Sequence, residues 1–179
     1  NFGYYCTESS GHDSEYLPYY RKNKAIMKRY MGGGYDGASR FYASNWPTWR
    51  RNCDQKRRDL VSGREKIITG RSWEYAGYII QAMETNDSFV IYGTVPNNGL
   101  ISNLPQDGVV EVACLVDRFG IRPTHYGKLP PQCAALCDWN MRFFDLAADA
   151  CINKSIETAA HALMLDPLTA AVSCPSDIR

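Results

Sequence analysis

Two short runs rich in β-branched and aromatic residues limit the folds open to this chain. They are FVIYGTV at residues 89–95 and VVEVACLV at residues 109–116, and turn-rich sequence at 97–108 separates them. Residues 118–130, which follow the second run, are expected to be irregular. Long helical patterns lie before and after the pair of runs. The expected strands are few, and they do not alternate regularly with helices. This arrangement predicts an α+β domain and argues against a doubly wound parallel sheet.

The helical patterns have recognisable ends. Residues 47–63 are expected to form a helix, because Pro47 suits a first helical position and Gly63 suits a stop. Residues 72–87 begin on a serine that can cap a helix, and their apolar residues recur at helical spacing. From Pro130 onward the sequence is helical in three successive stretches, at 130–153, 154–166 and 167–173.

Length and charge exclude several kinds of partner. The 179 residues suit one domain with a real core, and we expect a single domain over residues 1–179. The formal net charge is +1, so no global field favours nucleic acid or an anionic membrane. No apolar run approaches the roughly 18 residues needed to span a bilayer, and no signal peptide is visible.

Seven cysteines, an odd number, are spread widely through the chain. This pattern fits reduced and mostly buried thiols in a cytoplasmic protein better than a disulfide framework. Cys133 and Cys137 are four residues apart, which places them on one face of the helix expected there. A metal pair is one interpretation. Packing in the core is favoured, because no histidine or third cysteine lies nearby in sequence.

No familiar catalytic signature is complete in this sequence. It contains no glycine-rich dinucleotide loop after a strand and no phosphate-binding Walker loop, and both GxSxG and HExxH are missing. The three histidines are scattered along the chain. Any catalytic chemistry must therefore be sought in less standard segments.

The stretch GYYCTESSGHDSEYLPYYRK, at residues 3–22, combines five tyrosines with a histidine and several acids. Tyr16 follows His12 by four residues, so the two side chains would share a face if the segment were helical. A tyrosine can serve as a general base when a nearby cation or metal lowers its pKa. The alternative is an amphipathic aromatic cluster at the edge of the core, and composition alone favours that structural interpretation.

Two features near the strands also have a structural and a functional interpretation. Alternation along the second run puts Val110 and Val112 on one face and Glu111 on the other, where it faces either solvent or a site. The asparagines around Gly99, among them Asn97, fit turn chemistry. A glycine beside amide side chains would also let a sugar or a cofactor approach the backbone closely.

Four separated motifs together resemble one enzyme family. They are GYYCTESSGHDSEYLPYYRK, NNGLISNLPQDGVVEVACLVD, GIRPTHYGKLPPQCAAL and ALMLDPLTAAV, in this order and spacing. They resemble the C-terminal part of glycoside hydrolase family 4, and in particular its α-galactosidase and α-galacturonidase/α-glucuronidase branch. The resemblance extends from Gly3 to about Ile178.

The resemblance implies that this chain is the substrate-binding C-terminal domain of a longer enzyme. Family members begin with a Rossmann domain that binds NAD, and that domain would lie outside these residues. Their divalent metal, expected to be Mn²⁺, is usually held upstream of this segment, so no metal ligand is expected in this chain. The implied fold is the α+β C-terminal domain of the lactate/malate dehydrogenase type, with long helices and a mainly antiparallel sheet.

The family's mechanism is the NAD-dependent exception to hydrolysis by two carboxylates. Hydride passes from C3 of the sugar to NAD⁺, a tyrosine removes the acidified C2 proton, and the glycosidic oxygen leaves by elimination. Water then adds at C1 and hydride returns to C3. By resemblance Tyr16 is the catalytic base, while Thr7, Glu8 and His12 match a segment that contacts the sugar. Asn97 is a further candidate substrate ligand.

The same resemblance implies the substrate and the oligomeric state of the protein. One alternative function, which is not enzymatic, also stays open. The enzyme would act on a small-molecule glycoside as a homodimer or homotetramer. The sequence does not separate a galactoside from a galacturonide or a glucuronide. The alternative is a non-catalytic binding or oligomerisation module of the same fold, which would dimerise through the apolar helices of residues 130–172.

Overall fold

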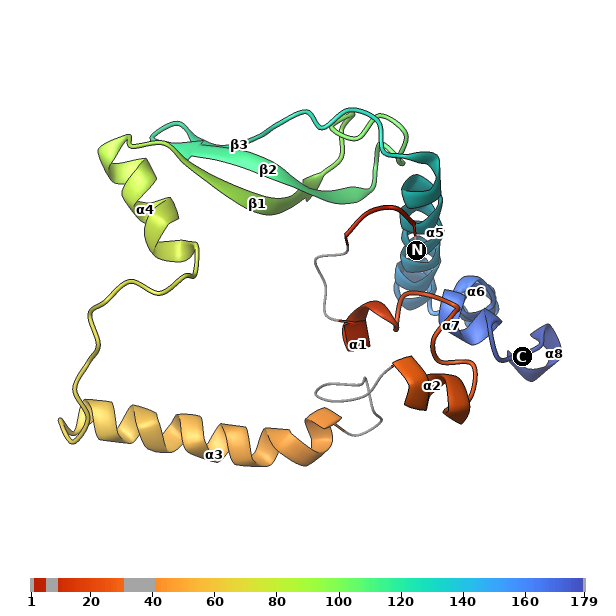
Figure 1. Cartoon of the computed structure of the whole chain (residues 1–179), viewed down its shortest axis with the longest axis horizontal. Helices are drawn as coiled ribbons and strands as arrows, with labels where there is room; N and C mark the ends of the chain where they lie inside the picture. Colours follow the sequence, from red (N-terminus) through yellow and green to blue (C-terminus); the bar gives the residue numbers. More distant parts are fainter. Residues whose placement is uncertain (1, 6–9, 31–40, 179) are drawn as a thin grey trace.

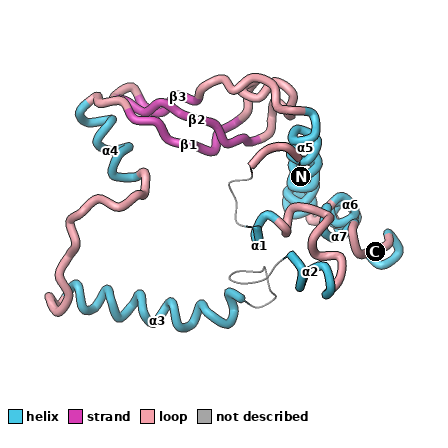
Figure 2. The backbone as a smooth tube through the Cα atoms, in the orientation of Figure 1, coloured by secondary structure: helices cyan, strands magenta, loops and turns pink. Residues whose placement is uncertain are grey.

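The computed structural model describes residues 2–5, 10–30 and 41–178 of the chain. One small sheet lies between α4 at one end and α5 at the other, and the last helices follow α5 (Figures 1 and 2). This is the α+β architecture that the sequence predicts. The elements, in chain order, are α1 (Ser10–Asp13), α2 (Lys24–Tyr30), α3 (Phe41–Val61), α4 (Ala76–Thr85), β1 (Phe89–Pro96), β2 (Val109–Asp117), β3 (Gly120–Pro123), α5 (Pro131–Asn153), α6 (Ile156–Leu165), α7 (Pro167–Ala170) and α8 (Pro175–Ile178).

The sheet is antiparallel and its strands lie in the order β1-β2-β3. Its register places Cys114 of β2 opposite Ile91 of β1. Val110 and Val112 are buried while Glu111 is exposed, so the period-two alternation predicted for this strand is confirmed. Glu111 therefore faces solvent here, which is the structural one of its two interpretations.

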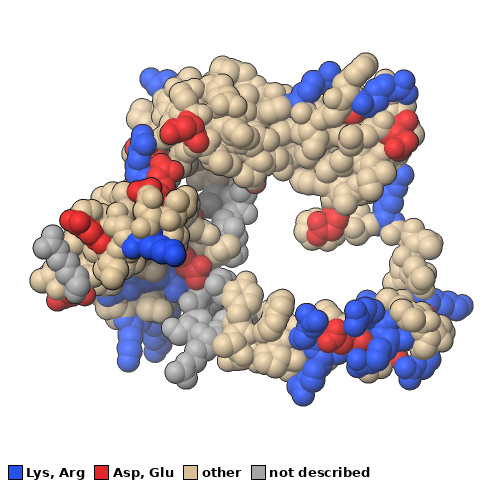
Figure 3. Space-filling view, turned by 180° about the vertical axis from the view of Figure 1, so that it is seen from behind, with Lys and Arg blue, Asp and Glu red and all other residues tan. Residues whose placement is uncertain are grey.

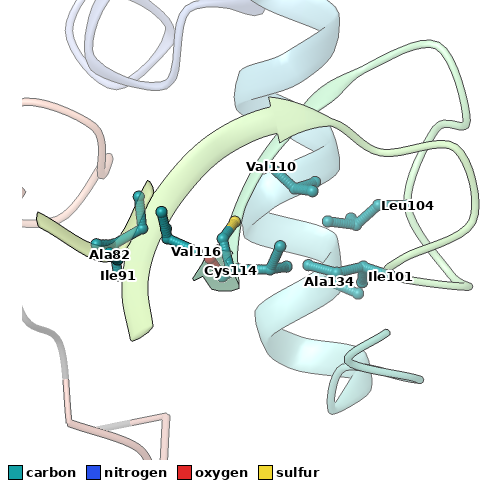
Figure 4. Packing of buried hydrophobic residues seen from close by; sticks show 9 residues of the cluster. Ala82, Ile91, Ile101, Leu104, Val110, Cys114, Val116 and Ala134 are labelled. Carbon is teal, nitrogen blue, oxygen red and sulfur yellow. Dashed lines mark hydrogen bonds between the residues drawn. The ribbon is translucent and has the colours of Figure 1, made fainter. Parts of the chain in front are cut away.

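The hydrophobic core lies on one face of this sheet. Figure 4 shows Cys114 and Val116 among the buried side chains, and both have 0% relative exposure. Ala82 brings α4 to this cluster and Ala134 brings α5, so both helices are anchored on the same sheet face. The complete cluster is Ala82, Ile91, Ile101, Leu104, Val110, Val112, Cys114, Val116 and Ala134.

Helix α3 stands apart from the sheet in Figure 1, and its basic side chains are interleaved with acidic ones in Figure 3. Arg50 and Arg57 both lie within ion-pair distance of Asp54, at 3.2 and 3.8 Å. The helix starts at Phe41, so the expected start at Pro47 is wrong. Pro47 lies inside the helix, where its missing N–H costs one backbone hydrogen bond. Across residues 2–5, 10–30 and 41–178, no helix is both long and apolar enough to cross a membrane.

Two other elements also differ from expectation. α4 begins at Ala76 rather than at Ser72. The Ser72 hydroxyl accepts a hydrogen bond from the backbone N–H of Glu74, in the bend that precedes the helix. β3 lies within residues 118–130, which were expected to be irregular. This strand of four residues forms by pairing with β2, and so short a run carries little pattern of its own.

The loop before β2 packs closely against α5 at Gly108, and we expect Gly108→Ala to destabilise the fold. A Cβ atom at this position would lie 1.9 Å from Cε of Met141 and 3.3 Å from the carbonyl oxygen of Pro105. The methionine end can rotate away, but the carbonyl is backbone. We expect the free energy of unfolding to fall by about 1–3 kcal/mol, the usual effect of overpacking. Urea denaturation followed by circular dichroism measures it.

Gly77→Ala provides the matched control for this substitution. Gly77 is an exposed residue of α4, and a Cβ atom added there would have no neighbouring atom within 4 Å. Because alanine is the better helix former, this variant should be as stable as the parent or up to about 1 kcal/mol more stable. If the two variants had equal free energies of unfolding, the loop would not need a glycine at position 108.

Candidate active site

The turn after α1 brings His12 and Tyr16 together. α1 ends at Asp13, but turn hydrogen bonds continue the coil, from Glu15 N to His12 O at 2.9 Å and from Tyr16 N to Asp13 O at 3.1 Å. The hydroxyl of Tyr16 lies 3.2 Å from Nε2 of His12, and the two ring centroids are 5.5 Å apart. Tyr16 is 39% exposed, so a ligand can reach its hydroxyl.

Arg21 braces this turn. Its Nε donates to Oγ of Ser14 at 3.0 Å, and its Nη2 lies 3.5 Å from Oε1 of Glu15. Ser14 has 1% relative exposure, so the bond lies on the protein side of the turn. The other carboxylate oxygen of Glu15 is 3.9 Å from Nε2 of His12. The His12–Tyr16 pair is therefore held by a polar network, in addition to the contact between its own rings.

Helix α5 positions the same N-terminal segment through two amide side chains. Nε2 of Gln132 donates to the carbonyl of Phe2 at 3.0 Å, and Nδ2 of Asn140 donates to the carbonyl of Tyr16 at 3.3 Å. Figure 1 shows this segment beside α5. Sequence reasoning missed both residues, because a polar side chain on a helix gives no signal of a partner that lies so far away along the chain.

Asn97 occupies a different part of the fold, the loop between β1 and β2. Its side chain has 0% relative exposure. Oδ1 accepts from the N–H of Ile101 at 2.7 Å, and Nδ2 donates to the carbonyls of Ile101, Leu104 and Pro105 at 3.0, 3.3 and 2.9 Å. These bonds use both polar atoms of the amide within the loop. They support the turn interpretation and weigh against direct contact with a sugar, which stays a prediction.

The structure brings together only part of the predicted substrate site. His12 and Tyr16 form one cluster, while Asn97 is bonded inside its own loop. Thr7 and Glu8 lie outside the described residues. The arrangement that is described offers a hydroxyl and an imidazole in contact at the surface, which is a pair able to exchange a proton.

The described residues do not fit a metal site. Within residues 2–5, 10–30 and 41–178, no three His, Cys, Asp or Glu side chains gather where they could hold an ion. Cys133 is half-buried and Cys137 is largely exposed, so the expected packing of this pair in the core is wrong. Atoms around the Cys137 sulfur nevertheless desolvate it, and this burial, followed by the nearby Cys133, raises the pKa of the Cys137 thiol. A raised pKa disfavours the thiolate, the form that binds metals.

The remaining thiols correct a second expectation. Of the cysteines in the described part of the chain, only Cys114 is buried, whereas mostly buried thiols were predicted. The cysteines of the described residues are free. They are Cys53, Cys114, Cys133, Cys137, Cys151 and Cys174.

Comparison with known proteins identifies the family. The C-terminal domain of family 4 glycosyl hydrolases matches residues 1–169 of this chain. The chain belongs to glycoside hydrolase family 4. It is 39% identical over 178 residues to an alpha-galactosidase of Bacillus subtilis (strain 168), a match that covers 99% of this chain and 40% of that protein. An alpha-galactosidase of Rhizobium meliloti (strain 1021) is 35% identical over 182 residues, which cover 99% of this chain and 37% of that protein. This family 4 chain thus spans about 40% of the length of these relatives.

A solved structure confirms the fold. The crystal structure of a 6-phospho-alpha-glucosidase from gut microorganisms, in complex with NAD and Mn²⁺, matches with a TM-score of 0.63 at 19% identity. The match covers 89% of the family 4 chain and 36% of the solved chain. At this identity the likeness concerns the fold, and it confirms an α+β domain with a small antiparallel sheet.

Proposed function

We propose that this family 4 chain is the substrate-binding C-terminal part of an α-galactosidase that depends on NAD and Mn²⁺. The identity with two alpha-galactosidases over 99% of the chain carries the proposal. An NAD-binding Rossmann domain would belong to the remainder of the full-length protein. In that protein NAD would supply the oxidation at C3 of the sugar, and the metal would be held by residues outside the described part of this chain.

Tyr16 and His12 are the groups through which this chain would act on the sugar. The exposed hydroxyl of Tyr16 would take the C2 proton of the bound glycoside. Nε2 of His12, at 3.2 Å, is close enough to accept the proton of the tyrosine hydroxyl and so to make its oxygen more basic. Arg21 and Asn140 would act as positioning residues, since they hold the turn and its backbone. Thr7, Glu8 and His12 are proposed sugar contacts, and Asn97 is a further predicted one.

An uncovered apolar surface supports the proposal that the protein is a homodimer or homotetramer. The sheet face opposite the core exposes Val90, Tyr92 and Val109 at 52%, 63% and 57%. Exposed Glu111 lies on the same face, between Val109 and the position opposite Tyr92, so these apolar side chains surround one charge. Exposed apolar side chains on a sheet face are a common feature of protein–protein interfaces. Light scattering on the full-length protein would test the association, and a monodisperse monomer would contradict it.

The residues of this chain lead us to expect that the 179-residue chain alone has no glycosidase activity. It carries no dinucleotide-binding loop, and catalysis by a cofactor depends on its fixed position against the substrate. The chain would be incubated with p-nitrophenyl α-galactoside, NAD⁺, Mn²⁺ and a reductant, and release of nitrophenol would be followed. Turnover under these conditions would refute the proposal that the cofactor domain lies elsewhere in the protein.

The activity itself is tested with the protein encoded by the complete gene. The p-nitrophenyl α-galactoside, α-galacturonide and α-glucuronide would be compared with and without NAD⁺ and Mn²⁺. We expect hydrolysis of the galactoside that requires both additions. If the protein prefers either uronide, the proposed activity changes from α-galactosidase to α-uronidase. If it hydrolyses none of the three substrates, the proposed function is wrong.

A further inference from the structure

An open cavity of about 720 Å³ lies beside the candidate active site. Its walls come from Phe2, from the segment after Tyr16, and from α2. The volume falls in the range of about 300–1,000 Å³ that is usual for small-molecule sites. The lining residues used below are Phe2, Tyr19, Tyr20, Ile26, Arg29 and Tyr30.

The cavity wall is a continuous series of aromatic rings. The ring centroids of Phe2 and Tyr19 are 6.1 Å apart, those of Tyr19 and Tyr20 are 6.2 Å apart, and those of Tyr20 and Tyr30 are 5.6 Å apart. These are contact distances for aromatic pairs, so each ring restrains the next. The bond from Gln132 to the carbonyl of Phe2 also fixes the first ring to α5. The wall is therefore built from parts that support one another.

The chemistry of the wall favours a flat and uncharged ligand. Aromatic faces bind planar or flat-faced groups by stacking, and tyrosine adds a hydroxyl that hydrogen-bonds. Among the described residues that line the cavity, Arg29 is the one cation, and its guanidinium lies 5.1 Å from the Tyr30 ring centroid in a cation–π arrangement. A phosphate group would be better served by several converging cations or backbone N–H groups. The cavity thus suits a sugar ring or an aryl ring.

The position of the cavity distinguishes it from the site of proton transfer. Neither His12 nor Tyr16 is among its lining residues. Tyr19 follows Tyr16 by three residues, so their Cα atoms are at most about 11 Å apart. One glycoside could therefore place its reacting sugar at the Tyr16 hydroxyl and its other ring against Tyr19 and Tyr30.

We propose that this aromatic cavity binds the leaving group of the glycoside, by stacking of a sugar or aryl ring on Tyr19 and Tyr30. This inference rests on the proposed function, because it takes Tyr16 as the group that meets the reacting sugar. The cavity would let the chain select among leaving groups, which the His12–Tyr16 pair does not do. Glycosides with a ring as leaving group are bound more tightly than the corresponding methyl glycosides.

The kinetic test uses the full-length protein and three α-galactosides, whose leaving groups are p-nitrophenol, glucose and methanol. In Tyr30→Ala, KM for the nitrophenyl and glucose-containing substrates should rise about three- to tenfold, the effect of one lost stacking contact, while KM for the methyl galactoside stays unchanged. Tyr30→Phe keeps the ring and should restore the parent values. Tyr126→Ala is the control, since Tyr126 is 60% exposed and does not line the cavity. A rise for only one of the two ring-bearing substrates identifies which ring the cavity accepts.

Failure of this inference can be separated from failure of the proposed function. An active enzyme in which Tyr30→Ala changes no KM, or changes all three equally, overturns the cavity assignment and leaves the galactosidase intact. If the full-length protein hydrolyses none of the substrates, binding is measured directly by titrating that protein with nitrophenyl and methyl α-galactoside. A preference for the nitrophenyl compound that Tyr30→Ala removes supports the cavity as a stacking site, and equal binding of the two compounds overturns it.

Discussion

Tyr16→Phe should lower kcat of the full-length enzyme for p-nitrophenyl α-galactoside by about 10²–10⁴-fold, the usual contribution of a positioned general base. The substitution removes the hydroxyl that lies 3.2 Å from His12 and keeps the ring that packs against the imidazole. KM for the substrate and for NAD⁺ should change little. Exchange of the sugar C2 proton with solvent deuterium should slow in parallel, because that proton transfer is the step assigned to Tyr16.

Tyr19→Phe and Tyr20→Phe are the matched controls for this result. They make the same chemical change in the same segment, and they keep the rings that line the aromatic cavity. Both should keep nearly normal exchange and turnover. If one of them abolishes activity while Tyr16→Phe is nearly normal, the base has been assigned to the wrong tyrosine. If all three variants are fully active, the tyrosine cluster is structural.

Asn97→Asp should lower the free energy of unfolding of the 179-residue chain by about 3 kcal/mol at neutral pH. The change puts a carboxylate, fully buried, where Nδ2 now donates to the carbonyls of Ile101, Leu104 and Pro105. One carboxylate oxygen keeps the N–H of Ile101, but the other faces carbonyl oxygens, and a buried charge that is only partly paired carries a penalty of this order. Urea denaturation followed by circular dichroism measures the change.

The pH dependence of the stability loss, and the control variant Asn98→Asp, test whether burial of the charge causes it. Burial among carbonyls raises the pKa of the introduced carboxyl in the folded state above its unfolded value. The loss of stability should therefore be smallest at acidic pH and grow as the pH rises through the unfolded pKa. Asn98→Asp makes the same change at an exposed position and should alter stability by less than about 0.5 kcal/mol. Equal effects of the two variants would show that the Asn97 amide does not brace the loop.

Local chemistry made much of this fold and part of its site predictable. The alternation of Val110, Glu111 and Val112 follows from the geometry of one strand, whichever strand pairs with it. The contact between His12 and Tyr16 follows from a spacing of four residues in a coiled segment. The family follows from four motifs whose order and spacing are properties of the chain itself. Each of these features depends on residues that are close in sequence, so the local sequence pattern is enough to predict it.

Only the tertiary structure decided which polar side chains brace the fold and where the cavity lies. The four bonds of Asn97 within the loop are visible only in the tertiary structure, and they weigh against its predicted contact with a sugar without testing it. Asn140 gave no signal in the sequence, because its partner, the Tyr16 carbonyl, belongs to the other end of the chain. The aromatic cavity needs Phe2, the Tyr19–Tyr20 pair and α2 to meet in space. The sequence by itself determined β1, β2, the approximate positions of the long helices, and the family, because their signals are local. Burial and the pairing of distant polar groups depend on how those elements pack, and one sequence read alone does not contain the packing.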